Sequence, residues 1–270
     1  MELLEPETRI GSVGTGEALA FRQNGWTPVR KLLGADVTAE ILARAKARMG
    51  EEPRTVLRQS PGERVENVYG WYARWDGCSH HDDYIASISH SVRLARVAAT
   101  LIGKPVRFYF DHIFAKLPAR SSGRDTPWHQ DLPHHPLDRH GALTMWIALT
   151  DCTPEMGSMR FLNGSHRAGL FGRFLNRDDG VTLVDDHSDV LERFGISLPV
   201  SLKAGDATVH DLAVIHHAPE NSSNEVRWVY VCQWLPADVR YTGAPNHRTD
   251  GLGLKLDQPF DHPFFPRIET

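Results

Sequence analysis

The first hundred residues carry apolar side chains at the spacing of a helix face. Between Val37 and Met49, apolar residues recur every three or four positions. This period predicts an amphipathic helix that begins after an N-cap at Asp36 and ends at Gly50. A second helix is predicted from about Tyr84 to Ile102, where the following Gly and Pro stop it. The N-terminal third is therefore expected to be mainly helical.

From about Val106 onward the pattern changes to that of strands. Short segments rich in β-branched and aromatic residues alternate with turn-forming clusters. The predicted strands are Val106–Lys116, Leu143–Thr150, Ser158–Leu162, Val200–Leu202, Ala207–Ile215 and Arg227–Leu235. Segments of this length and spacing predict an α+β, mainly β fold, a double-stranded β-helix (jelly roll, cupin-like) with the helices packed on one side.

The chain contains no repeat and no linker-like stretch, so residues 1–270 are expected to form a single domain. Within it we expect a helical N-terminal part at about 1–105 and a β-helix core at about 106–240. The stretch 168–197 is polar and spotted with glycine. Long insertions of this kind between strands often serve as lids or binding loops. We therefore expect a lid insertion at 168–197.

Composition narrows the class of protein further. The 41% hydrophobic and 24% charged content is ordinary for a folded globular protein. With 30 Lys+Arg against 34 Asp+Glu the net charge is −4, which argues against a nucleic-acid binder. Three cysteines are too few for a disulfide scaffold. Residues 1–10 lack the features of a signal peptide, and no apolar run approaches about 18 residues, so we expect a cytoplasmic protein without a membrane partner.

Histidine is abundant, with 15 residues, and one group has the spacing of metal ligands. In the segment Trp128-His129-Gln130-Asp131, alternation along a strand would place His129 and Asp131 on one side. A third ligand could come from His187, His210, His216 or His217. Two histidines and one carboxylate leave three positions open on a metal, as in the non-haem Fe(II) oxygenases. The His-x-Asp pattern alone is a weak signal, because it arises often by chance.

The surrounding sequence resembles the phytanoyl-CoA dioxygenase (PhyH) family of Fe(II)- and 2-oxoglutarate-dependent oxygenases. The resemblance extends from Gly25 to Pro236 and is strongest in three blocks. These blocks are Trp128–Asp131; Leu143–Thr150 with Glu155–Phe161 and Asn163–His166; and Gly205–Thr208 with His216, Asn221 and Arg227.

This resemblance implies that His129, Asp131 and His216 are the iron ligands. The distal ligand of the family lies five residues before an Asn and about eleven before the arginine that binds the co-substrate, and His216 satisfies both spacings. His217 is expected to point the opposite way. His210 shares a face with His216 only if no bulge intervenes.

The resemblance also implies a 2-oxoglutarate site. Arg227 is expected to hold the far carboxylate, because a guanidinium binds a carboxylate bidentately and keeps its charge. Trp146 matches a tryptophan that lines this pocket, and His112 occupies the place of a residue that touches the co-substrate, although its residue type departs from the family. Lys116 could face either the metal cavity or solvent.

The implied reaction consumes O₂ and 2-oxoglutarate, releases succinate and CO₂, and oxidises an unactivated C–H bond of a small molecule. The presence of Asp131 favours hydroxylation over chlorination. Two alternatives stay open, a cupin-like metalloenzyme that does not use 2-oxoglutarate and a non-catalytic binding protein.

The predicted pocket walls suggest a class of substrate. They are Tyr69, Trp71, Tyr72 and Trp75, the loop Leu132–His135 and the lid at 168–197. Aromatic walls favour a hydrophobic small molecule such as a natural-product intermediate. The absence of a basic cluster in the sequence argues against an acyl-CoA.

Overall fold

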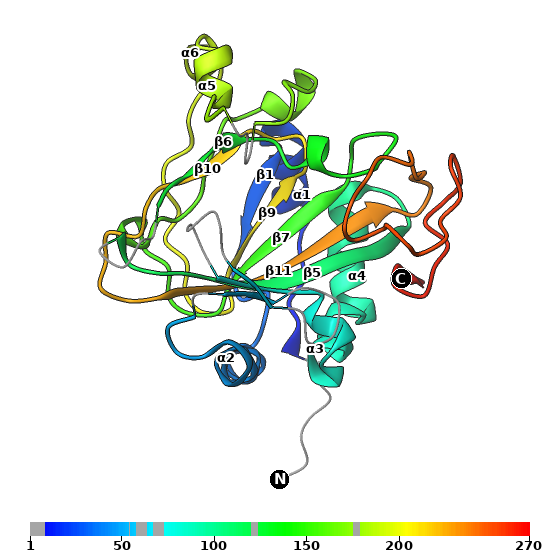
Figure 1. The fold of residues 1–270 in the computed structure, drawn as a ribbon, viewed down its shortest axis with the longest axis horizontal. Helices are drawn as coiled ribbons and strands as arrows, with labels where there is room; N and C mark the ends of the chain where they lie inside the picture. The colour runs from blue at the N-terminus through cyan, green and yellow to red at the C-terminus, as the bar shows by residue number, and fades with distance from the viewer. Residues whose placement is uncertain (1–8, 54, 58–63, 67–72, 120–123, 175–178) are drawn as a thin grey trace.

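Two β-sheets face each other and form the body of the protein (Figure 1). The computed structural model describes residues 9–53, 55–57, 64–66, 73–119, 124–174 and 179–270. The strands are β1 (Trp26–Val29), β2 (Thr55–Leu57), β3 (Arg64–Glu66), β4 (Ala73–Asp76), β5 (Val106–Lys116), β6 (Thr126–His129), β7 (Leu143–Ala148), β8 (Arg160–Phe161), β9 (Ala207–Asp211), β10 (His216–Ala218), β11 (Arg227–Pro236) and β12 (Arg267–Ile268).

The strand order identifies the fold. The large sheet runs β1-β9-β7-β11-β5-β4-β2-β3, with β12 paired to β5, and the small sheet runs β6-β10-β8. Along the path from β1 to β5 no two neighbouring strands are consecutive in sequence, and all pairs except β2–β4 are antiparallel. Sequence segments therefore alternate between the two sheets, which is the predicted jelly roll.

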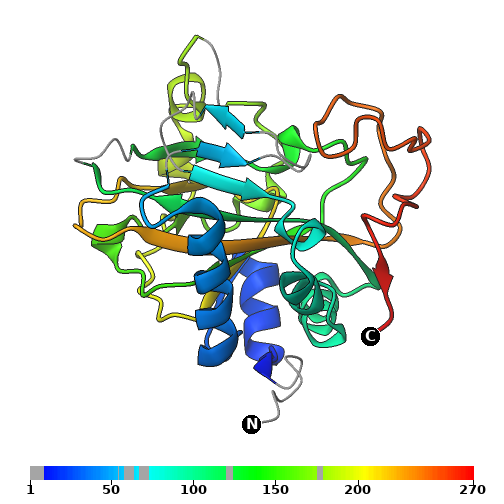
Figure 2. The ribbon, with the colours of Figure 1, turned by 60° about the horizontal axis from the view of Figure 1, so that its bottom comes forward.

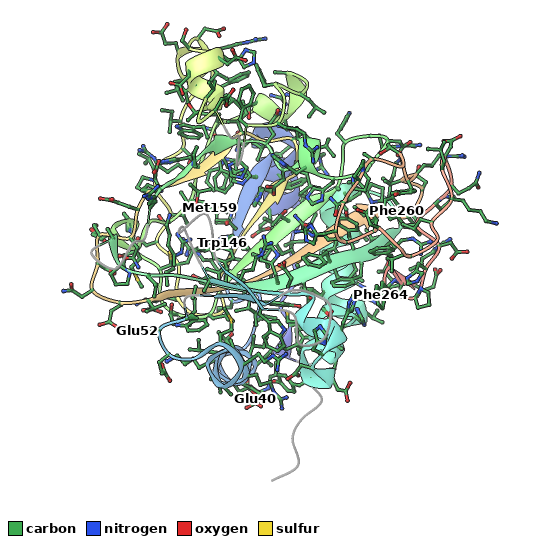
Figure 3. All side chains as sticks on the ribbon, viewed as in Figure 1. Glu40, Glu52, Trp146, Met159, Phe260 and Phe264 are labelled. Atoms are coloured by element: carbon green, nitrogen blue, oxygen red, sulfur yellow. The ribbon has the colours of Figure 1, made fainter. Side chains whose placement is uncertain are left out.

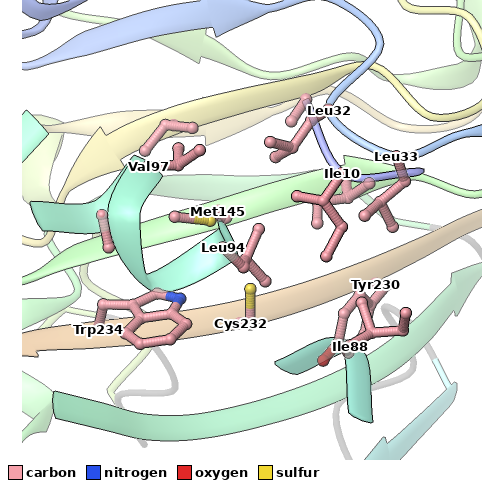
Figure 4. Close-up of a cluster of buried hydrophobic side chains, with 14 of the residues drawn as sticks. Ile10, Leu32, Leu33, Ile88, Leu94, Val97, Met145, Tyr230, Cys232 and Trp234 are labelled. Atoms are coloured by element: carbon pink, nitrogen blue, oxygen red, sulfur yellow. The ribbon is translucent and has the colours of Figure 1, made fainter. Parts of the chain in front are cut away.

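Helices cover the outer face of the large sheet (Figure 2). The covering helices are α1 (Thr15–Asn24), α2 (Ala35–Met49), α3 (Asp83–Ser89) and α4 (Val92–Ile102), whereas the short helices α5 (Leu183–Asp186) and α6 (Val190–Arg193) lie elsewhere, in the insertion 168–197. In the main core, Leu94 and Val97 of α4 lie over Met145, Cys232 and Trp234 of the sheet, all buried (Figure 4). Burying each such side chain contributes roughly 1.5–3 kcal/mol, and this layer leaves the inner face of the sheet for other uses.

The predicted helices need two corrections. The helix expected over Tyr84–Ile102 is two helices, because Ser91 is extended and its hydroxyl accepts a hydrogen bond from the backbone N–H of Leu94, which starts α4 afresh. The N-cap of the first predicted helix is Gly34 rather than Asp36. The predicted ends at Gly50 and Gly103 agree with the structure.

The strand predictions fail in the N-terminal third and near residue 212. The N-terminal third contains four short strands, β1 to β4, besides its helices. The strand expected over Ala207–Ile215 ends at Asp211, whose carboxylate accepts from the backbone N–H of Ala213 and turns the chain. Of Val200–Leu202, only Leu202 forms an isolated bridge. Strand β5 has the predicted bounds.

The insertion 168–197 packs against the small sheet in its described part. It contains α5 and α6, and it buries Phe174, Leu183 and Val190 against Leu162 and Ile215. The insertion begins beside the metal-ligand candidates, because the Gln130 amide donates to the carbonyl of Gly169. Among the described residues, no helix has the length and apolar character needed to cross a bilayer.

Candidate metal and co-substrate site

The structure brings His129, Asp131 and His216 together between the two sheets. One possible ligand atom from each lies within 4.8 Å of the others, and no other group of this kind occurs among the described residues. His129 on β6 and His216 on β10 are register partners across the small sheet, and their ring centroids are 4.2 Å apart. Directly opposed residues project from the same face, which explains why the two imidazoles meet.

Asp131 reaches the same point by a different route from the one predicted. Strand β6 ends at His129, and Asp131 lies after it in a helical conformation, at the start of a short 3-10 helix, Leu132–His134. Its Oδ1 lies 3.5 Å from Nε2 of His129 and 3.8 Å from Nε2 of His216. The carboxylate therefore joins the two imidazoles through a turn rather than through strand alternation.

Backbone carbonyls orient both imidazoles for metal binding. Nδ1 of His129 lies 2.7 Å from the carbonyl oxygen of Pro127, and Nδ1 of His216 lies 3.1 Å from that of Val214. A ring that donates from Nδ1 has its Nε2 lone pair free, and here both Nε2 atoms face Asp131. Burial, followed by the charge of His129, lowers the pKa of His216 well below its ordinary value. The donor set thus fits a divalent transition metal.

A chain of hydrogen bonds holds the Asp131 carboxylate. The Thr144 hydroxyl donates to its Oδ2 at 3.3 Å and accepts from the Gln233 amide at 3.1 Å. Arg248 Nη1 in turn donates to Oε1 of Gln233 at 2.9 Å. Burial alone would raise the pKa of Asp131, but the neighbouring imidazoles, His216 foremost, hold it well below its usual range. The carboxylate is therefore ionised and ready to bind a cation.

The competing histidines lie in three different places. His210, at the end of β9, lies beside the cluster, with Nε2 3.6 Å from Oδ2 of Asp131 and its ring 4.6 Å from that of His216. His217 stacks on Trp128 on the other side of β10, and His187 packs against Phe171 in the insertion. His210 is thus a neighbour of the site despite the turn between β9 and β10.

Arg227 lines the inner end of the cavity, and the buried side chain of Lys116 lies beside it. Arg227 and Lys116 are register partners on β11 and β5, and neither has a carboxylate within 4 Å among the described residues. Burial lowers the pKa of Arg227 to about 10, and burial together with the charge of Arg227 lowers that of Lys116 to about 6. Lys116 therefore faces the interior rather than solvent.

Carbonyl groups and one glycine shape this inner end. Arg227 donates to the carbonyl of Gly157, and Lys116 donates to that of Pro219 at 2.6 Å. Gly157 has φ of +74°, and a Cβ there would collide with the Pro219 carbonyl oxygen. The Asn221 amide donates to the carbonyl of Lys116, which ties the end of β5 to the turn before β11.

Trp146 and His112 both line the cavity that contains Arg227 and the metal-ligand candidates. The cavity has a volume of about 440 Å³, within the range of small-molecule sites. Arg227 lies over the Trp146 ring at 5.1 Å, and Met159 faces the same space (Figure 3). His112 projects from β5 between Phe110 and Phe114. Burial lowers the pKa of His112 well below its ordinary value, so the ring is neutral at pH 7.

The one described residue of the predicted aromatic wall does not line the cavity. Trp75 packs into the main core instead, and Tyr69, Trp71 and Tyr72 lie outside the described residues. Of the predicted loop, His134 and His135 do line the cavity. The sequence reading missed its other polar lining residues, Arg74, Thr144, Arg173, Gln233, Asn246, His247 and Arg248. A motif search could not find them, because they come from separate strands and loops.

A jelly roll that holds two imidazoles and one carboxylate beside a buried arginine defines the class of non-haem iron, 2-oxoglutarate-dependent oxygenases. The chain belongs to the phytanoyl-CoA dioxygenase family, whose profile matches residues 21–229.

Individual relatives agree with this membership. A phytanoyl-CoA dioxygenase of Arabidopsis thaliana is 28% identical over 58% of this chain and 54% of that protein, so the chain spans about half the length of this relative. The α-ketoglutarate-dependent carbocyclase SnoK from nogalamycin biosynthesis has a TM-score of 0.77 at 23% identity, covering 95% of this chain and 97% of SnoK. The epimerase SnoN, solved with Fe³⁺, α-ketoglutarate and a nogalamycin compound, has a TM-score of 0.74 at 25% identity, covering 93% and 96%.

Proposed function

We propose that this protein is an Fe(II)- and 2-oxoglutarate-dependent dioxygenase that oxidises an unactivated C–H bond of a small organic molecule. In this proposal His129, Asp131 and His216 bind the metal, and Arg227, Trp146 and His112 contact 2-oxoglutarate. The observation that carries it is the buried Arg227, which lines the same cavity as the metal-ligand candidates and has no carboxylate within 4 Å among the described residues. A metalloenzyme without 2-oxoglutarate has no need of a buried arginine at that place.

The charge balance of the cavity supports 2-oxoglutarate in particular. A buried cation without a counter-ion is costly, and a bound carboxylate removes much of that cost. Arg227 has an Nε without a partner among the described residues, and Lys116 makes its hydrogen bonds to carbonyl oxygens only. In this proposal a dicarboxylate with one end at Arg227 extends along the cavity past Trp146 toward Asp131. We therefore add Lys116 to the proposed co-substrate contacts.

Each residue then has a defined task. The carbonyls of Pro127 and Val214 hold His129 and His216 with Nε2 toward the metal position, and Thr144 holds Asp131. Iron bound there would supply the activation of O₂ that is coupled to decarboxylation of 2-oxoglutarate to succinate and CO₂. The apolar faces of Phe114, Trp146 and Met159 keep water from the co-substrate.

Anaerobic absorption spectroscopy tests the proposal. Purified protein receives Fe(II) and then 2-oxoglutarate, and the expected result is a weak visible charge-transfer band that needs both. The band should be lost in Arg227→Ala, and the co-substrate should be consumed when O₂ is admitted. Folded, iron-loaded protein that develops no band with 2-oxoglutarate would contradict the proposal and favour a metalloenzyme of another kind.

A further inference from the structure

A second buried arginine lies at the outer end of the cavity. Arg248 is buried, with 8% of the residue exposed, and its guanidinium lies over the Phe110 ring, 3.8 Å from the ring centroid. Its hydrogen bonds run from Nη1 to Gln233 and to His135. Nε has no partner, and no carboxylate lies within 4 Å of this guanidinium in the described part of the chain. The charge of Arg248 is therefore not balanced by a direct protein partner.

The surrounding charges do not supply the missing anion. Arg74 lines the same end and is paired with the buried Asp76 at 2.6 Å, so that carboxylate already serves another cation. Arg173 also lines the cavity, and among the described lining residues the only carboxylate is that of Asp131, the proposed metal ligand. The described lining of the outer end thus has an excess of positive charge.

The hydrogen-bond chain connects this arginine to the metal position. Arg248 donates to Gln233, Gln233 donates to Thr144, and Thr144 donates to Asp131. Each hydrogen bond orients the next group, so Nη1 of Arg248 is held toward Gln233 by this series. The rest of its planar fork is available to a ligand that lies beside the metal position.

We infer that the outer end binds an anionic group of the substrate, a carboxylate or a phosphate, through Arg248 with Arg74 nearby. The inference rests on the proposed function, because it assigns the substrate class of the same site. A guanidinium held over an aromatic ring can still donate its N–H groups to an oxyanion, and desolvation strengthens that contact. The substrate is then a small organic anion whose oxidised carbon lies close to its charged group, which differs from the hydrophobic molecule expected from the sequence.

Calorimetry with matched probes tests this inference. The protein is loaded anaerobically with Fe(II) and saturating 2-oxoglutarate, so that the inner end is filled, and is titrated with benzoate, phenyl phosphate and the uncharged benzamide. At least one anion should bind about tenfold more tightly than benzamide, and the better of the two anions distinguishes a carboxylate from a phosphate. The same titrations on metal-free protein give the answer even if iron loading fails.

Variants separate the anion site from general effects. Arg248→Gln should lower the affinity for the preferred anion about tenfold and leave benzamide unchanged, whereas Arg248→Lys should retain part of it because the charge remains. Arg139→Gln removes an exposed arginine that does not line the cavity and should change nothing. Equal affinity for benzamide and both anions, or an unchanged anion affinity in Arg248→Gln, would overturn the inference. The visible band with Fe(II) and 2-oxoglutarate, recorded for each protein, reports separately on the proposed function.

Discussion

Arginine occurs at both ends of the cavity, but the two ends hold it differently. Arg227 is 2% exposed and lies beside Lys116, with hydrogen bonds only to main-chain carbonyls. Arg248 is bonded to side chains that lead to Asp131, and the neighbouring Arg74 has its own carboxylate partner. Their aromatic platforms, Phe114 and Phe110, are four residues apart on β5, or about 13 Å along the strand.

This difference indicates that the two ends of the cavity bind different ligands. The inner end holds Arg227 through main-chain carbonyls, and we propose that its ligand is 2-oxoglutarate. The outer end positions Arg248 through neighbouring side chains, so its geometry depends on which side chains are present, and we propose that its ligand is the substrate. The metal-ligand candidates lie between the two ends, so either anion would approach the same point.

The largest expected effect is at that shared point. Asp131→Ala should abolish iron binding and 2-oxoglutarate consumption, because it removes the only carboxylate of the cluster. Metal content by mass spectrometry and succinate formation provide the measurements. His217→Ala serves as the matched control, since His217 stacks on Trp128 away from the cluster. Equal loss in both variants would remove the basis of the ligand assignment.

The next effect distinguishes the two ends directly. Arg227→Gln should weaken 2-oxoglutarate binding by about 100-fold, or roughly 3 kcal/mol, because charge-assisted hydrogen bonds to the carboxylate are lost. Arg248→Gln, the same change at the other end, should alter it by less than about threefold. Titration of the visible band gives both affinities. Similar losses in the two variants would mean that the ends are not separate sites.

The affinity for 2-oxoglutarate, which we propose binds at the inner end, should depend on pH through Lys116. The pKa of Lys116 is lowered to about 6, so the free protein holds it neutral at pH 7, and a bound carboxylate raises that pKa. Binding of 2-oxoglutarate then takes up a proton. Its affinity should be constant below pH 6 and fall above it, by at most about tenfold per pH unit, until the pKa of the complex is reached.

Calorimetry in buffers of different ionisation enthalpy measures this proton uptake. Lys116→Met, which keeps the length of the side chain and removes its charge, should abolish the uptake. Uptake of the same size in that variant would assign the proton to another group and remove Lys116 from the co-substrate site.

The smallest effect concerns the connection between the outer end and the metal. Thr144→Val removes the hydroxyl that joins Gln233 to Asp131 and should lower iron affinity by about tenfold, as is usual for hydrogen bonds to metal ligands. Thr208→Val is its control, because the Thr208 hydroxyl is buried and has no partner among the described residues. Iron titration of both variants checks the difference. An unchanged affinity in Thr144→Val would show that the chain of hydrogen bonds does not support the metal.

The sequence predicted the parts of the fold that depend on local periodicity. Strand β5 has the expected bounds because β-branched and aromatic residues recur throughout it, and the jelly roll follows from the spacing of such segments. The break at Ser91 was missed because the apolar stripe continues through it. Strands β1 to β4 are only three or four residues long, too short for any period to show.

The candidate site was predicted unevenly for a related reason. His129, Asp131 and His216 were identified from a motif and its spacing, and the structure brings them together. Lys116 was left undecided, since a lysine has the same appearance in sequence whether it faces solvent or a cavity. The arginines of the outer end come from three distant segments of the chain. No basic cluster is therefore visible in the sequence, and the fold brings these arginines to one cavity.

The segment that follows β11, from residue 237 to the end of the chain, bears on how substrate preference could change in an enzyme of this fold. It returns through Phe260 and Phe265, which pack on Tyr109, and it carries Arg248 into the cavity. The match to the family profile ends at residue 229, before this segment begins. Exchange of loops here would give a new substrate preference while the oxidising machinery in the strands is inherited intact. Laboratory evolution aimed at new products would therefore do best to randomise this stretch first.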